Sequence, residues 1–214
     1  LMLDTPAGTI AVVGLGESFG SAITADVRQA GTVALDPESV QRGIDLAHEA
    51  GADKVVALVH WGDNYMPVNR EQRYWARMLA LAGYDLVVGA GPHVAQPVEM
   101  VHGTPVVFSL GNYVFGSPGR FDTYGQRGVG LVLDIGFGAG EDPALSFRCV
   151  RTDNEAVSYQ PHLCNRQTAR RALSELSPLM HLNRDGSATF RPDAKPALRP
   201  VRKPAQQPAA RTAR

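Results

Sequence analysis

The stretch Lys54-Val-Val-Ala-Leu-Val-His-Trp-Gly-Asp63 decides the fold of this chain. Its apolar run has no polar interruption, which is typical of a strand that is covered on both faces. A second such run, Asp85-Leu-Val-Val88, ends in Gly89-Ala-Gly-Pro-His93. Between the two runs, Asn69-Arg-Glu-Gln72 matches a helix capping box, and an apolar stripe at helical spacing follows it. These segments predict two parallel strands that are joined by a helix in a right-handed crossover.

The sequence on either side predicts the remaining elements of an α/β fold. Thr9–Val13 is rich in β-branched residues, and we expect it as an edge strand or an entry strand of the sheet. Asp36-Pro37 marks the start of a helix. Asn165 precedes another helix, whose apolar stripe runs to Met180 and which Pro178 ends or bends. Further strands are predicted in four segments, the first two as a hairpin: 97–101, 105–109, 128–135 and 144–151.

Length and composition are those of a protein with one main domain. The chain has 214 residues, of which 44% are apolar, and its acidic and basic residues are equal in number. The absence of net charge excludes a general attraction to nucleic acid or to an anionic membrane, so no specific nucleic-acid partner is expected. No apolar run is long enough for a membrane helix, and no signal sequence opens the chain.

We expect a domain over residues 1–190 and a disordered tail over residues 191–214. From Lys195 onward the tail has six basic residues and no acidic ones, and a proline recurs every fourth position from Pro196 to Pro208. Such a segment buries too little apolar surface to offset the entropy of ordering. The two cysteines, Cys149 and Cys164, are equally compatible with one disulfide in an oxidising compartment and with two reduced, buried thiols.

Each of the two buried strands is followed by a histidine at the carboxyl edge of the predicted sheet, where α/β proteins bind ligands. A neutral imidazole beside a glycine turn suits a divalent metal such as Zn²⁺, Mn²⁺ or Fe²⁺. His60 is equally consistent with a structural histidine beside Trp61. His93 is the stronger candidate, because Gly89 and Gly91 form a turn that another group can approach closely.

Other polar residues near this edge have more than one interpretation. Glu99 suits a general acid or base, or a partner that orients a histidine, but an outward-facing strand carboxylate explains it equally well. Asn112 follows a strand that breaks at a glycine, where its amide can bind a metal, bind a phosphate oxygen or cap the turn. Asp63 and Tyr65 follow His60 and can reach the mouth of such a site.

Four short motifs follow one another between residues 54 and 115. They are V-H-W-G-D-N-Y from Val59, G-A-G-P-H ending at His93, Q-P-V-E ending at Glu99, and S-L-G-N-Y ending at Tyr113. In this order they resemble the CapA-type family of poly-γ-glutamate and capsule synthesis proteins, relatives of the calcineurin-like metallophosphoesterases.

The resemblance implies an α/β fold, an αββα sandwich of the metallophosphoesterase type, with a divalent metal (Mn, Fe or Zn) at the strand ends. The metal ligands it implies are His60 and His93, and Glu99 and Asn112 are expected to have catalytic roles in the pocket. Substrate contacts are expected from four residues near the same edge: Trp61, Asp63, Tyr65 and Gln72.

Two classes of function remain open. The first is a metal-dependent hydrolase or transferase that acts on an anionic polymer or a phosphorylated small molecule. The second is a non-catalytic component of a cell-envelope synthesis or export complex, and in this case the component binds an anionic polymer such as poly-γ-glutamate. The resemblance to the family also implies a place in the cell envelope, outside the cytoplasm.

The chain also departs from the family pattern. Many members have a histidine where this chain has Ala90, and often a glutamate where it has Asn64. The G-D strand end and the N-N-H segment of the family's N-terminal half have no counterpart before Leu1. We therefore expect the chain to be the C-terminal part of such a domain, with an incomplete set of ligands, weak metal binding and poor catalysis when isolated.

Overall fold

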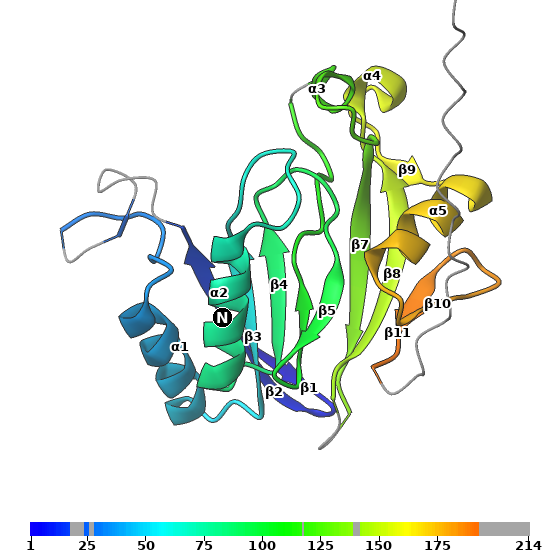
Figure 1. Cartoon of the computed structure of the whole chain (residues 1–214). Coiled ribbons are helices and arrows are strands. Elements are labelled where there is room, and N and C mark those ends of the chain that lie inside the picture. Colours follow the sequence, from blue (N-terminus) through cyan, green and yellow to red (C-terminus); the bar gives the residue numbers. More distant parts are fainter. Residues whose placement is uncertain (18–23, 26–27, 117, 139–141, 193–214) are drawn as a thin grey trace, which may run out of the picture.

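The computed structural model of this protein describes residues 1–17, 24–25, 28–116, 118–138 and 142–192. Two β-sheets share one apolar core, and two long helices cover the other face of the first sheet (Figure 1). The tail that we expect over residues 191–214 lies, from residue 193 onward, outside the described residues. None of the helices within those ranges combines the length and the apolar character that a membrane crossing requires.

The first sheet contains the predicted crossover and hairpin. In spatial order its strands are β1 (Met2–Thr5), β2 (Gly8–Gly16), β3 (Lys54–His60), β4 (Leu86–Ala90), β6 (Thr104–Val107) and β5 (Val98–Val101). Parallel pairing joins β2 to β3, β3 to β4 and β4 to β6, and the antiparallel strands β1 and β5 close the two edges. Of the two predicted places for Thr9–Val13, edge strand and entry strand, the edge is wrong, because β1 pairs with β2 on its outer side.

The helices α1 (Pro37–Glu49) and α2 (Arg70–Ala82) start at the predicted caps. The side chain of Asp36 accepts a hydrogen bond from the backbone of the first turn of α1 at 2.7 Å. In the capping box of α2, Gln72 N donates to Asn69 Oδ1 at 2.8 Å, and Asn69 N donates to Gln72 Oε1 at 3.1 Å. The buried faces of both helices pack against the first sheet in one apolar cluster.

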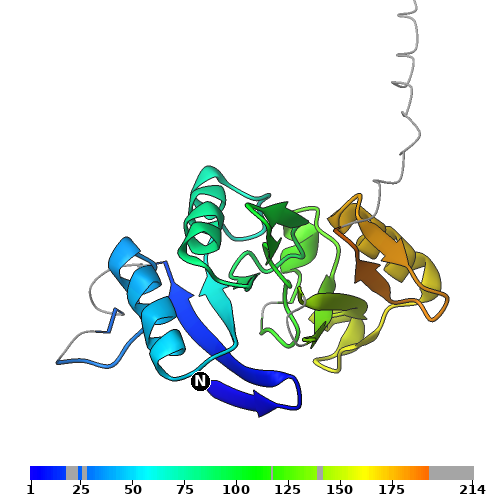
Figure 2. The same cartoon turned by 90° about the horizontal axis from the view of Figure 1, so that it is seen from below.

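The second sheet is antiparallel and smaller. Its main path is β10 (Met180–Leu182), β11 (Ala188–Phe190), β8 (Ala144–Arg151) and β7 (Val129–Gly136), and β9 (His162–Leu163) pairs with the end of β8. Two helices of one turn, α3 (Arg120–Thr123) and α4 (Asn154–Val157), lie in its connections. In Figure 2 the segments from β7 onward, coloured yellow-green to orange, lie on the side of the molecule away from α1.

The core between the sheets also receives the last helix, α5 (Arg166–Leu176). Leu173 of α5 packs in the same cluster as Val88 of the first sheet and Phe147 of the second. As predicted, α5 ends before Pro178, but the prediction that Met180 belongs to it is wrong, because Met180 is the first residue of β10. The protein is therefore an α/β sandwich.

Glycines allow three chain segments to meet at the carboxyl ends of β3, β4 and β6. A Cβ atom at Gly89 would lie 2.1 Å from the Phe108 carbonyl oxygen and 2.4 Å from Trp61 Nε1. At Gly91, with φ +121°, it would lie 2.3 Å from the Trp61 carbonyl oxygen. The protein's own backbone thus explains the close approach that we expected a bound group to make at these two glycines.

The two cysteines form a disulfide between β8 and the segment that leads into α5. Cys149 and Cys164 are 15 residues apart in the sequence, and Cys164 N also donates to the Cys149 carbonyl oxygen at 2.9 Å. Of the two alternatives that the sequence left open, the structure contains the bridge.

Replacement of Gly89 by alanine is expected to lower the free energy of unfolding by about 1–3 kcal/mol, because the added methyl group overlaps the Phe108 carbonyl and the Trp61 indole. Gly14→Ala in β2 is the matched control, since a Cβ atom there meets nothing within 4 Å. Urea denaturation of both variants measures the difference. Equal stability of the two variants would show that the contacts at Gly89 can relax freely.

The double substitution Cys149→Ala/Cys164→Ala is expected to lower the free energy of unfolding by about 3 kcal/mol, because the disulfide restricts a loop of this size in the unfolded chain. Guanidinium denaturation without reductant measures the loss. Wild-type protein treated with dithiothreitol should reach the same stability as the double variant. Two free thiols in protein isolated under oxidising conditions would contradict the bridge.

Stability is expected to fall as the pH rises from about 10 to about 12, because burial raises the pKa of Tyr84 to about 12. The folded protein holds this phenol proton more tightly than the unfolded chain does. The resulting contribution to the free energy of unfolding is fully present below the ordinary pKa of tyrosine and is lost as the pH rises toward the pKa in the folded protein. Tyr84→Phe should flatten this decline, whereas Tyr74→Phe, at an exposed position, should not. Denaturant titrations across this pH range measure both slopes.

Candidate functional site

The parallel strands of the first sheet end at the same level. Gly16 of β2 is in register with His60 of β3, and His60 is in register with Ala90 of β4. The backbone continues this alignment, since Glu17 N donates to the His60 carbonyl oxygen and Trp61 N donates to the Ala90 carbonyl oxygen. The loops that follow these strands therefore gather at one edge, which is where ligands bind in open α/β sheets.

His93 is held in a defined orientation at this edge. Its Nδ1 lies 2.8 Å from Asn112 Oδ1, and its backbone has the left-handed φ of +63°. Because an amide oxygen only accepts hydrogen bonds, this contact places a proton on Nδ1, and the neutral form of the imidazole then has its free lone pair on Nε2. Asn112 thus selects the tautomer in which Nε2 can bind a metal or accept a proton.

Aromatic rings pack around His93. The ring of Tyr65 stacks on the imidazole with centroids 5.2 Å apart, and the ring of Phe115 lies at 4.3 Å. Tyr124 stacks in turn on Tyr65 at 4.7 Å, with the two planes 3° apart. Tyr65 also has a left-handed backbone, with φ +62°, and its N–H donates to the Pro92 carbonyl oxygen at 2.7 Å. These contacts hold the two loops together.

The phenol of Tyr65 remains protonated at physiological pH. Burial raises its pKa, and this effect exceeds the opposite effects of the Arg120 charge and of a hydrogen bond from Asn112. Asn112 thus holds His93 and also affects the pKa of the tyrosine that stacks on it. We regard Tyr65, His93 and Asn112 as the centre of the site.

His60 lies at the same edge as His93, in an exposed position at the end of β3. A Cβ atom at Gly91 would be 3.0 Å from His60 Cδ2, so the imidazole lies beside the turn that leads to His93. Asp63 is also exposed, and its carboxylate accepts a hydrogen bond from Asn69 Nδ2 at 2.9 Å. These two side chains are accessible from solvent.

Two of the residues expected to contact substrate are instead fully buried. Trp61 Nε1 donates to the Phe108 carbonyl oxygen at 2.8 Å. Gln72, which belongs to the capping box of α2, donates through Nε2 to Gln96 Oε1 at 2.8 Å. Both side chains support the loops at the strand ends from inside, so neither is among the residues that we propose to contact substrate.

Glu99 is paired with a basic residue of α2. Its two carboxylate oxygens accept hydrogen bonds from Arg73 at 2.9 and 3.1 Å, and this pairing raises the pKa of the guanidinium group. The Arg73 guanidinium also lies 5.4 Å from the centroid of the Phe108 ring. An acid or base role for Glu99 stays a prediction, since its carboxylate is held by Arg73 in this structure.

Glu17 is a strand-end residue that the sequence reasoning missed. Its Oε2 accepts a hydrogen bond from Gly62 N at 2.9 Å, which fixes the turn after His60. Burial raises the pKa of Glu17 above its ordinary value, with smaller contributions from the charges of Glu71 and Asp63, although the Gly62 hydrogen bond opposes the shift. Its position directly after the Gly14-Leu-Gly16 strand end was the signal that could have identified it.

The described residues contain no group of three or more His, Cys, Asp or Glu side chains that could hold a metal ion. Two imidazoles lie at this edge, those of His60 and His93, and neutral imidazole is a common ligand of divalent metals. A typical catalytic zinc site has three protein ligands. Among the described residues, this edge thus offers fewer protein ligands of these types than such a site has.

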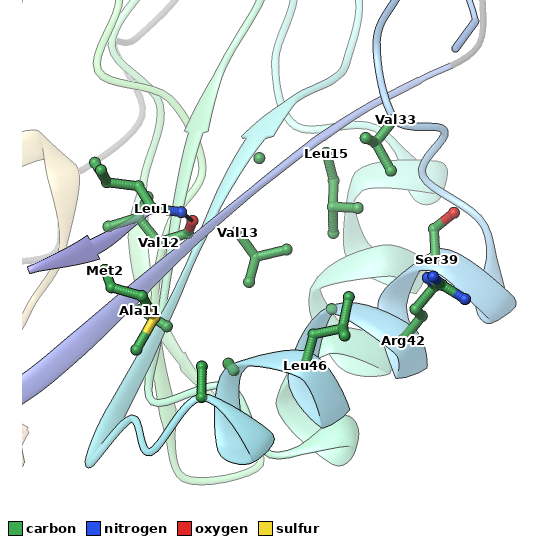
Figure 3. Close-up of a pocket in the computed structure, with 14 residues that line it drawn as sticks. Leu1, Met2, Ala11, Val12, Val13, Leu15, Val33, Ser39, Arg42 and Leu46 are labelled. Atoms are coloured by element: carbon green, nitrogen blue, oxygen red, sulfur yellow. Dashed lines mark hydrogen bonds between the residues drawn. The ribbon is translucent and has the colours of Figure 1, made fainter. Parts of the chain in front are cut away.

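A separate apolar groove of about 470 Å³ runs between β2 and α1 (Figure 3). Val13 and Leu15 of β2 face Leu46 and Arg42 of α1 across it, and Leu1 lies at its β1 end. The residues Glu17, His60, Tyr65, His93 and Asn112 do not line this groove. It is therefore distinct from the candidate site.

Comparisons with known proteins agree with the resemblance noted in the sequence. Residues 3–117 match the family model described as bacterial capsule synthesis protein PGA_cap. The PGA biosynthesis protein CapA of Bacillus subtilis (strain 168) is 40% identical over 108 residues, which are 50% of this chain and 28% of that protein. The capsule biosynthesis protein CapA of Bacillus anthracis is 32% identical over 111 residues, which are 50% of this chain and 27% of that protein.

The chain thus spans just over a quarter of the length of these relatives. The matched residues include the whole strand-end site, from Glu17 through His60 and His93 to Asn112. The family match covers more than half of the chain and confirms the resemblance, so this protein belongs to the bacterial capsule synthesis protein family.

Proposed function

We propose that this chain supplies part of a metal-dependent hydrolase or transferase site in a capsule biosynthesis protein. The observation that carries the proposal is the hydrogen bond between His93 Nδ1 and Asn112 Oδ1, because it leaves Nε2 at the strand ends as the nitrogen whose lone pair can bind a metal. An oriented histidine whose second nitrogen is fixed by a polar partner is the usual arrangement of a metal ligand.

In the chemistry that we propose, a divalent cation (Mn²⁺, Fe²⁺ or Zn²⁺) and the side chains of the protein have separate roles. Such a cation, when bound, polarises a phosphoryl or acyl oxygen and lowers the pKa of water. In this chain His93 and His60 would hold it, Asn112 would keep the His93 tautomer, and Tyr65 and Phe115 would keep the imidazole in place. Further ligands would have to come from outside the described residues.

We propose an anionic polymer or a phosphorylated small molecule as the substrate. The accessible side chains at the strand ends, His60 and Asp63, are the ones that a substrate could reach first. A place in the cell envelope, outside the cytoplasm, is supported by two observations. The family is one of capsule synthesis proteins, and the chain contains a disulfide, which persists mainly in oxidising compartments.

The incomplete ligand set favours a second candidate function. In this alternative the chain is a non-catalytic component of an envelope synthesis complex, and it binds an anionic polymer without chemistry. The two candidates differ in whether the strand-end histidines bind a metal.

Calorimetric titration of Zn²⁺ and Mn²⁺ into the chain separates them. The first proposal expects weak binding that His93→Asn abolishes and that Asn112→Leu weakens by about 10–100-fold, because the imidazole loses its orienting partner. Asparagine is chosen at position 93 because it tolerates the left-handed backbone. The matched control is His102→Asn, since His102 also has a positive φ but lies in the β5–β6 turn at the opposite end of the sheet.

Unchanged metal binding in His93→Asn would contradict the role of this residue. Absence of metal binding in the wild-type chain, together with retained polymer binding, would favour the non-catalytic alternative. Tight, stoichiometric binding of a metal by the isolated chain, together with steady hydrolysis of a phosphodiester, would instead show that its own ligand set is complete.

A further inference from the structure

Four arginines surround a cleft in the second sheet, in the part of the chain that lies beyond the family match. The cleft opens where β8 changes its partner. β11 pairs with Leu145–Phe147 of β8, and β9 pairs with Val150–Arg151, so that Arg148 and Cys149 lie between the two. Two adjoining cavities of about 290 and 300 Å³ occupy this place and share Arg166, Gly186 and Ser187.

We call this feature the arginine cleft, and define it by Arg148 of β8, Arg166 and Arg170 of α5, and Arg184 of the β10–β11 turn. All four side chains are exposed. Within the described ranges, none of the four forms an ion pair with an acidic side chain, although Arg73, Arg127 and Arg171 do so elsewhere. The charges of the cleft are therefore available to a ligand.

Asp185 is the one carboxylate that lines the cleft in the described part of the chain. It accepts hydrogen bonds from Ser187 N at 3.0 Å and from Ser187 Oγ at 2.7 Å. These bonds, followed by the charge of Arg148, lower its pKa, so it stays ionised. One negative charge faces four positive ones, and the cleft has a net positive charge.

The start of α5 adds to this positive potential. Arg166 is its first residue, and its first turn contains no acidic side chain. The N-terminal end of a helix carries a partial positive charge, which favours acidic residues in the first turn and disfavours basic ones. An anion in the cleft would offset this unfavourable arrangement.

The walls of the cleft are fixed before any ligand binds. The disulfide between Cys149 and Cys164 joins β8 to the segment that carries Arg166. In the opposite wall, Asn183 Nδ2 donates to Ser187 Oγ at 2.9 Å and to Thr189 Oγ1 at 3.1 Å, which holds the turn that carries Arg184. A preformed site loses less entropy on binding than a flexible one.

We propose that the arginine cleft binds an anionic polymer of the polycarboxylate class. Guanidinium groups pair with carboxylates through two parallel hydrogen bonds. Four of them distributed over two adjoining cavities suit successive carboxylates of one chain better than a single small anion. Among the described residues no aromatic side chain lines either cavity, so this part of the cleft lacks the stacking surfaces with which proteins bind single-stranded nucleic acid. The inference rests on the link to capsule synthesis but not on metal chemistry at His93.

The test is a fluorescence anisotropy titration of labelled poly-γ-glutamate with the 214-residue chain at low salt. Arg166→Gln/Arg184→Gln is expected to weaken binding by about tenfold or more, since it removes two charge-assisted contacts. Arg70→Gln/Arg77→Gln on the exposed face of α2 makes the same change in charge and is expected to leave affinity within about twofold. The six basic residues from Lys195 onward are the same in every variant.

Three results would overturn the proposal. In the first, the wild-type chain fails to bind poly-γ-glutamate at all, and in the second, the two double variants lose affinity equally. In the third, single-stranded DNA of the same charge binds the wild-type chain more tightly than poly-γ-glutamate does. If thermal unfolding shows that Arg166→Gln/Arg184→Gln is misfolded, Arg148→Gln/Arg170→Gln is compared with the same control. The metal proposal is tested by titration of Zn²⁺ and Mn²⁺ without polymer, and this proposal by titration of polymer without added metal, so the failure of one is distinguishable from the failure of the other.

Discussion

The strand-end site depends on one close approach, in which β4 and the segment after β6 meet at Gly89. The missing side chain lets the Phe108 carbonyl approach β4 and lets the indole of Trp61 donate to that same carbonyl. Leu110 N also donates to the Gly89 carbonyl oxygen. The ends of β3, β4 and β6 are joined in this way without any bound group. The loops that carry His60, His93 and Asn112 consequently leave the sheet at one edge.

The central crossover could be predicted from the sequence because its signals are local. A run of apolar residues, a capping box and an apolar stripe each follow from the periodicity of one element. The strands β10 and β11 could not be found in this way, since each has only three residues and their pairing depends on β8. The prediction for Met180 failed for the same reason, because its apolar character fits a strand as well as a helix.

The site was predicted less completely than the fold. Sequence position placed His60, His93 and Asn112 near one edge. The contact between His93 and Asn112, however, depends on a left-handed backbone at His93, which no local sequence pattern predicts. The burial of Trp61 and Gln72 follows from distant partners, the Phe108 carbonyl and Gln96. Glu17 was missed because its role depends on the turn at Gly62, which is 45 residues away in the sequence.

The two sheets carry different kinds of chemistry. The first sheet, within the family match, presents His60 and an oriented His93 whose imidazole is packed among aromatic rings. The second sheet, beyond that match, presents fixed positive charges on a scaffold that a disulfide reinforces. A substitution in one sheet can therefore change one property of the protein and leave the other intact.

The left-handed backbones of Tyr65 and His93 have a consequence for how the protein tolerates sequence change. Each costs about 1 kcal/mol or more relative to an ordinary conformation, and the stacking of the two rings helps to maintain both. Loss of either ring would let its own loop relax and would also remove the support of the other. Changes at these two positions are thus thermodynamically coupled, and the cost of replacing both rings is expected to be smaller than the sum of the costs of the two single replacements.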